Sequence, residues 1–265
     1  EARPDLTFPQ QAGEASDIRV AHCPERVLPG KVLQELISND RIIGGMTQPC
    51  SIAASNLYKI FVQGGCIETN ARTAEMCKLT ENSFRDVNIA FANELSVICD
   101  KLDINVWELI ALANRHPRVN ILQPGQSVGG HCIAVDPWFI VAKTPEQARL
   151  IRTAREVNDS KPEWVIDQVK IKIAEFLQAN PEKTIKDVTV ACYGLAFKPD
   201  IDDLRESPAL EITKKLAEQG LNILAIEPNI SELPDKLPIN VKLINLNERE
   251  KADIHLILVN HHNFQ

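Results

Sequence analysis

The stretch Val188-Thr189-Val190-Ala191-Cys192-Tyr193-Gly194-Leu195 is almost entirely apolar, is rich in β-branched residues and closes on a glycine, which predicts a buried strand. A helix is expected over 207–220, because a Ser-Pro pair opens it and a glycine ends it. Two more buried strands are predicted at 222–226 and 254–259. Strand, helix and strand at this spacing form a right-handed crossover in a parallel sheet, so residues 181–265 are interpreted as an incomplete α/β domain.

The turn after the first of these strands, residues 194–200, combines a glycine with Lys198. A glycine-containing turn that follows a parallel strand can bind a nucleotide phosphate, so this turn is a candidate phosphate site. It lacks the G-x-G-x-x-G spacing and is therefore not a dinucleotide fingerprint.

The middle of the chain, residues 50–180, is predicted to be nearly all helical. The longest helix is expected at 72–102, where apolar residues recur at three- and four-residue steps and form one stripe. The stripe consists of Cys77, Phe84, Val87, Phe91, Leu95, Ile98 and Leu102. A helix of roughly 45 Å usually forms a spine between domains or at a dimer interface. Further helices are expected at about 105–114, 144–158 and 160–179.

The beginning of the chain is loop-rich, with two short strand candidates at 17–21 and 40–45. Residues 23–30 contain two prolines, a glycine and a charged pair, which predicts an irregular loop. Such a loop suits ligand contact, and a solvated turn is the plainer alternative. A helix at 51–62 and a strand at 66–69 are expected next.

A second distinctive stretch is Val128-Gly129-Gly130-His131-Cys132-Ile133-Ala134-Val135-Asp136-Pro137, which sets a cysteine behind two glycines and an aspartate four residues later. Glycines let backbone N–H groups approach a ligand, and a thiol held there can act as a nucleophile if its surroundings favour the thiolate. The structural alternative is equally simple. Free cysteines are commonly buried, and Asp136 followed by proline also fits a helix N-cap.

Lys78, Asn82 and Arg85 recur at i, i+4 and i+7 in the long predicted helix, so their side chains stack over two turns. Two cations flanking an amide can hold an anionic or polyhydroxylated ligand. A solvated helix face explains the same spacing, and the spacing leaves both interpretations open.

Composition narrows the class of protein. A net charge of −7 argues against a nucleic-acid binder, which would carry a basic excess. The 7 cysteines have irregular spacing and no C-x-x-C pair, which fits a reducing cytosol better than a disulfide framework and disfavours a zinc site. No apolar stretch approaches about 18 residues, so no membrane span is expected. The chain lacks an initiator methionine and a signal peptide and is expected to be a piece of a longer protein.

Five ordered motifs resemble the UDP-glucose/GDP-mannose dehydrogenase family, and the resemblance covers residues 23–259. The motifs are Pro24-Glu25 before a glycine, Asp40-Arg41-Ile42-Ile43-Gly44-Gly45, Ala74-Glu75-Met76-Cys77-Lys78 with Asn82, Gly129-Gly130-His131-Cys132 with Asp136, and Gly194-Leu195-Ala196-Phe197-Lys198 through Arg205-Glu206-Ser207-Pro208. Residues 23–30 and 116–120 look most like the branch that oxidises UDP-N-acetyl-D-mannosamine.

The resemblance implies two Rossmann-like domains joined by a helical region that forms a homodimer. On that pattern, residues 1–48 are the tail of an NAD-binding domain and 49–180 are a helical dimerisation domain with a long spine helix. Residues 181–265 are then a truncated Rossmann-like domain that binds a UDP-sugar. The Gly-rich turn through which the family binds NAD is absent from this sequence, so the chain by itself is expected to be inactive.

The resemblance also implies a reaction: the C6 alcohol of a UDP-sugar becomes a carboxylate and two NAD+ are reduced, in the cytoplasm, for bacterial surface polysaccharide synthesis. Cys132 would form a thiohemiacetal and then a thioester, and Lys78 would stabilise the oxyanions. Asn82 would hold a water or a hydroxyl, and Asp136 would act as a base. Arg205 would contact NAD. The implied substrate-binding set is Glu25, Arg26, Val27, Lys78, Asn82, Arg85, His116, Arg118, Gly129, Phe197 and Lys198.

Two alternatives stay open. The substrate could instead be UDP-N-acetylglucosamine, UDP-N-acetylgalactosamine or UDP-glucose. The chain could also be a non-catalytic module that binds a UDP-sugar and dimerises, whereas a purely structural helical scaffold would bind no UDP-sugar and leave Cys132 unreactive.

Overall fold

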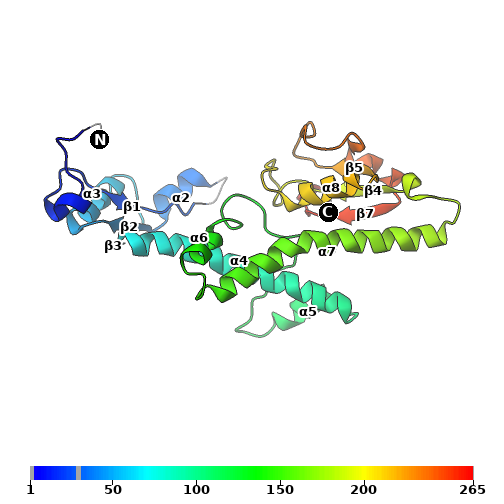
Figure 1. The fold of residues 1–265 in the computed structure, drawn as a ribbon, viewed down its shortest axis with the longest axis horizontal. Coiled ribbons are helices and arrows are strands. Elements are labelled where there is room, and N and C mark those ends of the chain that lie inside the picture. Colours follow the sequence, from blue (N-terminus) through cyan, green and yellow to red (C-terminus); the bar gives the residue numbers. More distant parts are fainter. Residues whose placement is uncertain (1–2, 28–30, 265) are drawn as a thin grey trace. The chain divides into compact units, whose positions relative to one another are not determined.

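The structure, a computed structural model, describes residues 3–27 and 31–264. It divides into two compact units, Glu1–Asn82 and Ser83–Gln265, and the division falls inside helix α4 (Ala71–Lys101). Figure 1 shows the helices and strands of both units, coloured along the chain. Helices combined with parallel strands confirm the predicted α/β class.

The first unit is built on a three-stranded sheet in the order β1-β2-β3, with β1 (Ala21–His22), β2 (Arg41–Gly45) and β3 (Cys66–Asn70). β1 is antiparallel to β2, whereas β2 and β3 are parallel and are joined by α3 (Gln48–Tyr58). The remaining elements of this unit are α1 (Pro9–Ala12), the 3-10 turn η1 (Gly13–Ala15) and α2 (Val32–Ser38).

The domain boundary expected after residue 48 falls inside this β-α-β unit. All five residues of β2 pair with β3, from Arg41 opposite Cys66 to Gly45 opposite Asn70. The structure therefore moves α3 and β3 out of the helical middle and into the first unit. Periodicity predicted both elements but not their pairing, because strand pairing depends on residues far apart in the sequence.

The second unit contains a four-stranded sheet in the order β6-β5-β4-β7, in which all neighbours are parallel. The strands are β4 (Thr189–Tyr193), β5 (Asn222–Ile226), β6 (Val241–Leu243) and β7 (Ile254–Ile257). β6 was not predicted because it is only three residues long. The helices of this unit are α5 (Val106–Ala113), α6 (Asp136–Lys143), α7 (Arg149–Ala179) and α8 (Pro208–Glu218), with 3-10 turns η2 (Ile185–Asp187), η3 (Leu246–Lys251) and η4 (His262–Phe264).

One face of this sheet is covered by α8 and the C-terminal half of α7. Ile166 of α7 and Ile212 of α8 are fully buried in one cluster with Val190 of β4. Each fully buried aliphatic side chain of this kind contributes roughly 2 kcal/mol. Ser207 caps α8 by accepting from the Leu210 N–H at 3.3 Å, and its hydroxyl donates to the Leu195 carbonyl at 2.7 Å. This cap fixes the start of α8 to the turn after β4.

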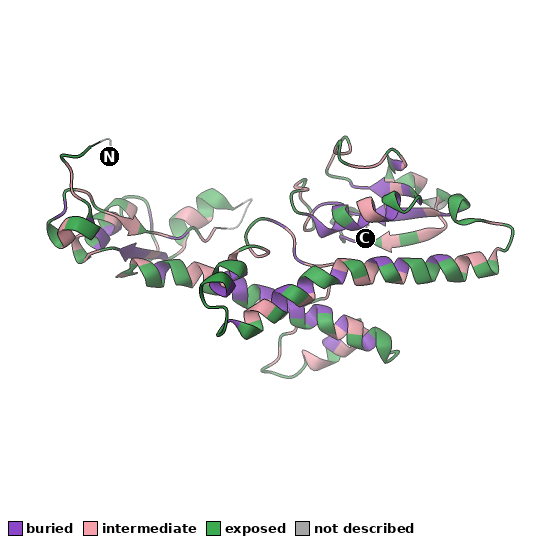
Figure 2. Cartoon of the chain, in the orientation of Figure 1, coloured by how far each residue is buried: buried purple, intermediate pink, exposed green. Residues whose placement is uncertain are grey.

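The buried faces of α4 and α7 meet through polar side chains. Asp86 and Asn93 of α4 and Arg155 and Asn158 of α7 are all buried. Figure 2 shows buried residues gathered where these two helices cross. The predicted apolar stripe of α4 lies elsewhere: the exposed fractions are 69% for Phe84, 51% for Phe91, 45% for Ile98 and 61% for Leu102. These four side chains of the stripe are therefore not buried by the residues that the structure describes.

α7 corrects the prediction of two helices at 144–158 and 160–179. It is one helix that begins at Arg149 and contains Pro162. A proline removes the N–H that would bond the carbonyl four residues earlier, which usually breaks a helix. Here the Asn158 carbonyl accepts instead from the Ser127 hydroxyl at 2.6 Å. Because the Asn158 carbonyl has a hydrogen-bond donor in place of the missing N–H, the helix continues past Pro162. Among the described residues, no helix is both long and apolar enough to cross a membrane.

Candidate active site

Cys132 lies in a tight turn that leads into α6. Its carbonyl accepts from the Val135 N–H at 3.1 Å and from the Asp136 N–H at 2.8 Å, so one helical turn separates the thiol from the Asp136 carboxylate. Cys132 is exposed and is a free thiol, which removes the alternative of a buried structural cysteine. The predicted N-cap is wrong by one residue: Val135 occupies the N-cap and Asp136 is the first helical residue. Asp136 therefore does not occupy the N-cap position.

The two glycines before Cys132 are required by packing within the chain. A Cβ on Gly129 would lie 2.7 Å from both Phe197 Cβ and Pro208 Cδ, and Gly130 has φ +79° with the Phe197 ring beside it. The Gly129-Gly130 backbone therefore rests on the turn that carries Phe197 and Lys198. This packing brings the cysteine loop and the predicted nucleotide-binding turn together, which sequence spacing alone could not show.

Arg205 is held next to this loop by Asp203. Asp203 accepts from Nε and Nη2 of Arg205 at 2.6–3.1 Å in a bidentate pair. The hydrogen bonds from Arg205 lower the pKa of Asp203 to about 2, with a smaller contribution from the charge of His131. His131 precedes Cys132 directly, so Arg205, Asp203 and the cysteine loop share one neighbourhood.

In the first unit, the predicted sugar-contacting loop is docked onto two elements. Glu25 accepts from the buried Arg41 at 3.0 Å and from the Arg26 and Val27 backbone N–H groups at 2.7 and 3.1 Å. Burial is the largest single influence and opposes the charge of Glu25, but the hydrogen bonds from Arg41, Arg26 and Val27 and the charge of Arg41 together outweigh it, so the pKa of Glu25 lies below its usual value. Arg26 pairs with Glu81 of α4 at 2.8 Å. Residues 28–30 of this motif lie outside the described residues.

The Arg26–Glu81 ion pair brings residues 25–27 to the turn of α4 that carries Lys78 and Asn82. Lys78 is half-buried, Asn82 is buried and Arg85 is exposed. Lys78 and Asn82 belong to the first unit, whereas Arg85 and Cys132 belong to the second. The predicted residues thus fall into two groups, one around Lys78 and one around Cys132.

His116 and Arg118 both lie in the second unit. They are exposed in the loop after α5, and the Arg118 backbone N–H donates to His116 Nδ1 at 3.4 Å. Among the described residues, no hydrogen bond or ion pair joins them to the cysteine loop or to Phe197.

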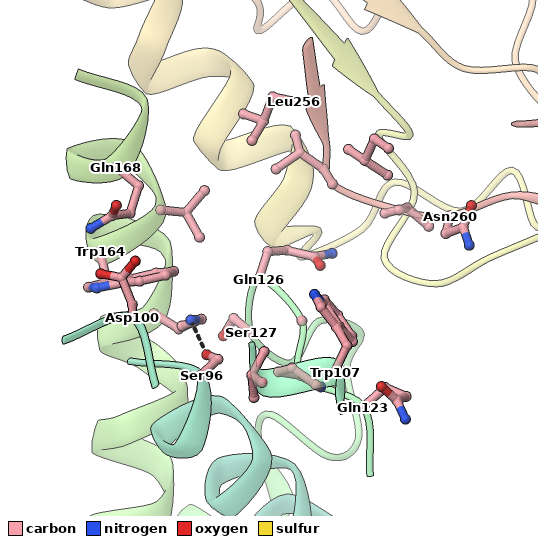
Figure 3. A pocket seen from close by; sticks show the side chains of 18 of the residues that line it. Ser96, Asp100, Trp107, Gln123, Gln126, Ser127, Trp164, Gln168, Leu256 and Asn260 are labelled. Carbon is pink, nitrogen blue, oxygen red and sulfur yellow. Dashed lines mark hydrogen bonds between the residues drawn. The ribbon is translucent and has the colours of Figure 1, made fainter. Parts of the chain in front are cut away.

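A pocket of about 1460 Å³ opens beside the predicted nucleotide turn in the second unit. Its lining includes Trp107, Gln123, Gln126, Lys161, Phe197 and Lys198. Figure 3 shows Trp107, Gln126 and Ser127 grouped between the helices and the end of β7. The sequence predicted Phe197 and Lys198, but it missed Trp107 and the two glutamines. Trp107 lies in the first turn of α5 and the two glutamines lie in a loop, and no spacing pattern in the sequence marks them.

A buried polar network, also missed from the sequence, ties the approach to Cys132 to both long helices. Asn158 donates to Asp86 Oδ1 at 2.8 Å and accepts from Asn93 at 2.9 Å. Arg155 donates to the same Asp86 oxygen at 2.6 Å, and Asn93 Oδ1 accepts from the Gly125 N–H at 2.8 Å. Burial raises the pKa of Asp86 despite the Arg155 charge. The loop at 125–127 is thereby fixed to α4 and α7.

Comparison with known proteins agrees with this architecture. The chain matches three models in order: the NAD binding domain of the UDP-glucose/GDP-mannose dehydrogenase family over residues 4–62, the central domain over 72–160 and the UDP binding domain over 191–265. The chain belongs to the UDP-glucose/GDP-mannose dehydrogenase family, as its motifs predicted.

Several individual proteins of known name are similar to this chain. The chain is 66% identical, over its whole length, to the UDP-N-acetyl-D-mannosamine dehydrogenase of Escherichia coli strain K12, and spans 63% of that protein. It is 63% identical over 99% of its length to the NDP-N-acetyl-D-galactosaminuronic acid dehydrogenase of Ralstonia nicotianae, and spans 60% of it. Among solved structures, a UDP-N-acetyl-mannosamine dehydrogenase from S. aureus is 48% identical with a TM-score of 0.76, over 94% of this chain and 56% of that one.

Proposed function

We propose that this chain forms the sugar-oxidising part of an NAD-dependent dehydrogenase that converts the C6 alcohol of a UDP-N-acetylhexosamine to a carboxylate. UDP-N-acetyl-D-mannosamine is the first candidate substrate and its uronate the product. The observation that carries the proposal is the 66% identity with the Escherichia coli UDP-N-acetyl-D-mannosamine dehydrogenase over the whole chain. The 63% identity with the NDP-N-acetyl-D-galactosaminuronic acid dehydrogenase favours the galactosamine epimer as the second candidate.

The chemistry explains why an exposed thiol is needed. Loss of a proton from the C6 hydroxyl and of a hydride from C6 gives an aldehyde, which is a poor hydride donor. Addition of the Cys132 sulfur to the aldehyde carbon gives a tetrahedral thiohemiacetal, and loss of its hydride gives a thioester. Water then cleaves the C–S bond, which returns the thiol and leaves the carboxylate. When bound, NAD+ supplies the hydride acceptor, and each carboxylate formed consumes two NAD+ and one water.

Asp136 accepts protons and Lys78 stabilises negative oxygen atoms in these steps. The Asp136 carboxylate, one helical turn from the thiol, takes a proton from Cys132 or from the hydrolytic water. The Lys78 ammonium donates to the alkoxide and to the oxyanion of each tetrahedral species, a contribution typically worth about 10²–10³ in rate. Asn82 holds a hydroxyl or the water. The proposal requires Lys78 and Cys132 to act on the same carbon in the complete enzyme.

The remaining predicted residues bind the sugar. Residues 25–27 approach it from the loop that Arg26 anchors to α4. Gly129 offers its backbone to the sugar, and Arg85 contacts a phosphate or the acetamido group. His116 and Arg118 reach a substrate on the partner subunit, which fits their exposure.

The UDP portion is assigned to the large pocket of the second unit. Lys198 offers an ammonium to the diphosphate, and Phe197 and Trp107 offer apolar ring faces to the uracil. The amides of Gln123 and Gln126 provide both donors and acceptors for the uracil edge or the ribose.

Arg205 fits a contact with NAD. A guanidinium carries five N–H donors, and Asp203 engages only Nε and Nη2 of Arg205. The side chain is exposed, so its remaining N–H groups can meet a phosphate of the dinucleotide. Because the sequence contains no G-x-G-x-x-G, we assign no other part of the dinucleotide to this chain.

The exposed stripe of α4 is assigned to a second copy of this chain. Four large apolar side chains at steps of seven, seven and four residues present a continuous surface along α4. Packing that surface on its symmetry mate would bury it, as the homodimer expected from the family requires.

The test uses the complete enzyme with UDP-N-acetyl-D-mannosamine and NAD+. We expect two NADH per sugar and stoichiometric uronate from the wild type, and no uronate from Cys132→Ser. Cys66→Ser, at the half-exposed start of β3, is the matched control and should behave as the wild type. Undiminished uronate formation by Cys132→Ser would refute the thioester route.

Calorimetry on this chain distinguishes an active dehydrogenase from a non-catalytic module that only binds a UDP-sugar. UDP-N-acetyl-D-mannosamine should bind with or without NAD+, and no NADH should form if the chain only binds. NADH formation by the isolated chain would exclude the module.

A further inference from the structure

The turn after β4, residues 194–200, is held by a buried carboxylate at the end of the neighbouring strand. Glu227 follows β5 directly, and its side chain is fully buried. Its Oε2 accepts from the Leu195 N–H at 2.8 Å and from the Ala196 N–H at 3.1 Å. The first two N–H groups after Gly194 are therefore already bonded to an anion of the protein.

A buried histidine extends this arrangement to the far end of the turn. His261 lies beyond β7 and is fully buried, and its Nε2 donates to Glu227 Oε2 at 2.9 Å. Its Nδ1 accepts from the Asp200 N–H at 2.9 Å. Because Nδ1 is an acceptor, the neutral ring carries its proton on Nε2. Glu227 and His261 thus fix both ends of the segment that carries Phe197 and Lys198.

The second carboxylate oxygen is also saturated with donors. Glu227 Oε1 accepts from the Asn229 N–H and from the Asn229 side-chain amide, each at 3.1 Å. All partners of both oxygens are donors, which is the arrangement that an ionised carboxylate needs when buried. Glu227 is therefore a fixed negative charge at the carboxyl ends of the parallel strands.

This position is where parallel α/β sheets usually bind a ligand. The strand order reverses between β4 and β7, which are neighbours in the sheet. In parallel α/β sheets, ligands bind in the crevice at the carboxyl ends of the two strands where the order reverses. In dinucleotide-binding crossovers, backbone N–H groups of the first turn hold the pyrophosphate. Here the Glu227 carboxylate occupies those N–H groups.

We propose that Glu227 is an internal anion that excludes a phosphate from the backbone of the β4 turn and, with His261, positions Phe197 and Lys198 for UDP. The diphosphate must then be held by side chains, Lys198 first, so this crossover accepts a nucleoside diphosphate and not a dinucleotide. The positioning half of the inference depends on the proposed UDP site, whereas the exclusion of phosphate does not.

The experiment compares this chain with Glu227→Ala and with the exposed control Glu232→Gln. Affinity for UDP is measured by calorimetry, and the effect of inorganic phosphate is measured as a shift of the thermal midpoint. Glu227→Ala should weaken UDP binding at least about tenfold, because it frees the turn and leaves buried donors without a partner. Phosphate should raise the midpoint of Glu227→Ala but not that of the wild type or the control. Formate, which replaces the lost carboxylate, should restore part of the UDP affinity of Glu227→Ala and leave the control unchanged.

The outcomes separate the two proposals. If the wild type does not bind UDP but Glu227→Ala gains the response to phosphate, the proposed UDP site fails and the exclusion of phosphate stands. If Glu227→Ala binds UDP as the wild type does, with no response to phosphate or formate, the inference is overturned. Should Glu227→Ala not fold, His261→Gln and His261→Leu replace it. Glutamine offers a donor and an acceptor and should keep most of the affinity, whereas leucine should lose it; equal affinities would overturn the inference.

Discussion

The hydroxyl of Ser127 donates a 2.6 Å hydrogen bond to the backbone carbonyl of Asn158, four residues before Pro162 in α7. Proline cannot supply the N–H that this carbonyl would receive in a regular helix, so the loop that leads to Cys132 supplies a hydroxyl instead. The carbonyl that lacks its helical hydrogen bond in α7 is therefore also the point at which the proposed catalytic loop is attached to this helix.

This relationship predicts a coupling between positions 127 and 162. Ser127→Ala should lower the free energy of unfolding by about 1–2 kcal/mol, because a buried carbonyl loses its donor. In a Pro162→Ala background the same change should cost less, since the new N–H at 162 can bond Asn158. Urea unfolding of the four proteins measures the coupling. Ser160→Ala, which removes an exposed hydroxyl bonded to Val157, is the control with little effect, and additive changes at 127 and 162 would contradict the account.

Gly129 and Gly125 predict opposite responses to alanine. A Cβ at Gly129 would lie 2.7 Å from Phe197 Cβ and Pro208 Cδ, whereas a Cβ at Gly125 would meet nothing within 4 Å. Gly129→Ala should therefore push the cysteine loop off the β4 turn, at a cost of about 1–3 kcal/mol in stability, with weaker UDP binding. Gly125→Ala should retain both properties. Thermal unfolding and UDP titration of the two variants provide the comparison, and equal behaviour would show that the loop does not rest on Phe197.

The second unit shows what the sequence could and could not predict. The predicted strand at 222–226 and the helix opened by Ser207-Pro208 are confirmed because their signals are local: apolar runs, a cap and a closing glycine. α7 was divided in two because its continuation past Pro162 depends on Ser127, 35 positions earlier in the sequence. No local signal marks Glu227, since its partners come from the turn after β4 and from beyond β7.

The proposed active site shows the same division between local and distant information. The spacing of Cys132 and Asp136 is local, and the structure places them one turn apart, whereas their catalytic roles follow from the family resemblance and stay a prediction. The α4–α7 network was missed because Asp86 and Asn158 become partners only when two helices pack. The sequence predicted the apolar stripe of α4 but not its exposure to solvent. Periodicity shows that one face of a helix is apolar, but it does not show which residues pack against that face.

The exposed stripe predicts how the chain assembles. Phe91→Asp places a charge in the middle of the stripe and should weaken a homodimer at least about tenfold, since burying an unpaired carboxylate is unfavourable. Ile239→Asp changes an apolar side chain that is 99% exposed in the second unit and should leave the dimer unchanged. Sedimentation velocity over a range of concentrations measures both. A dimer that tolerates Phe91→Asp would place the interface elsewhere.

We expect the replacement of Lys161 by an apolar residue to stabilise the folded state, by an amount that depends on pH. Its ammonium is buried, donates to Ser96 at 2.5 Å and lies 3.5 Å from the centre of the Trp164 ring. Burial lowers the pKa of Lys161 to about 8, and the charge of Asp100 offsets this only in part. Because the folded state disfavours the charged form, the penalty is complete below pH 8. Between about pH 8 and the unfolded pKa of about 10.4, the unfolded chain binds more protons, so wild-type stability rises with pH.

Lys161→Met should therefore be more stable than the wild type at pH 7, by at most about 3 kcal/mol, and the difference should shrink toward zero by about pH 10.5. Methionine fills a similar volume and packs well against an indole. Ser96 keeps its own bond, because its hydroxyl donates to the Asn93 carbonyl at 2.6 Å. Urea midpoints at pH 7, 9 and 10 test the convergence. Lys172→Met, at an exposed lysine of the same helix paired with Glu175, should show no such trend, and a pH-independent gain for Lys161→Met would mean that the ammonium carries no desolvation penalty.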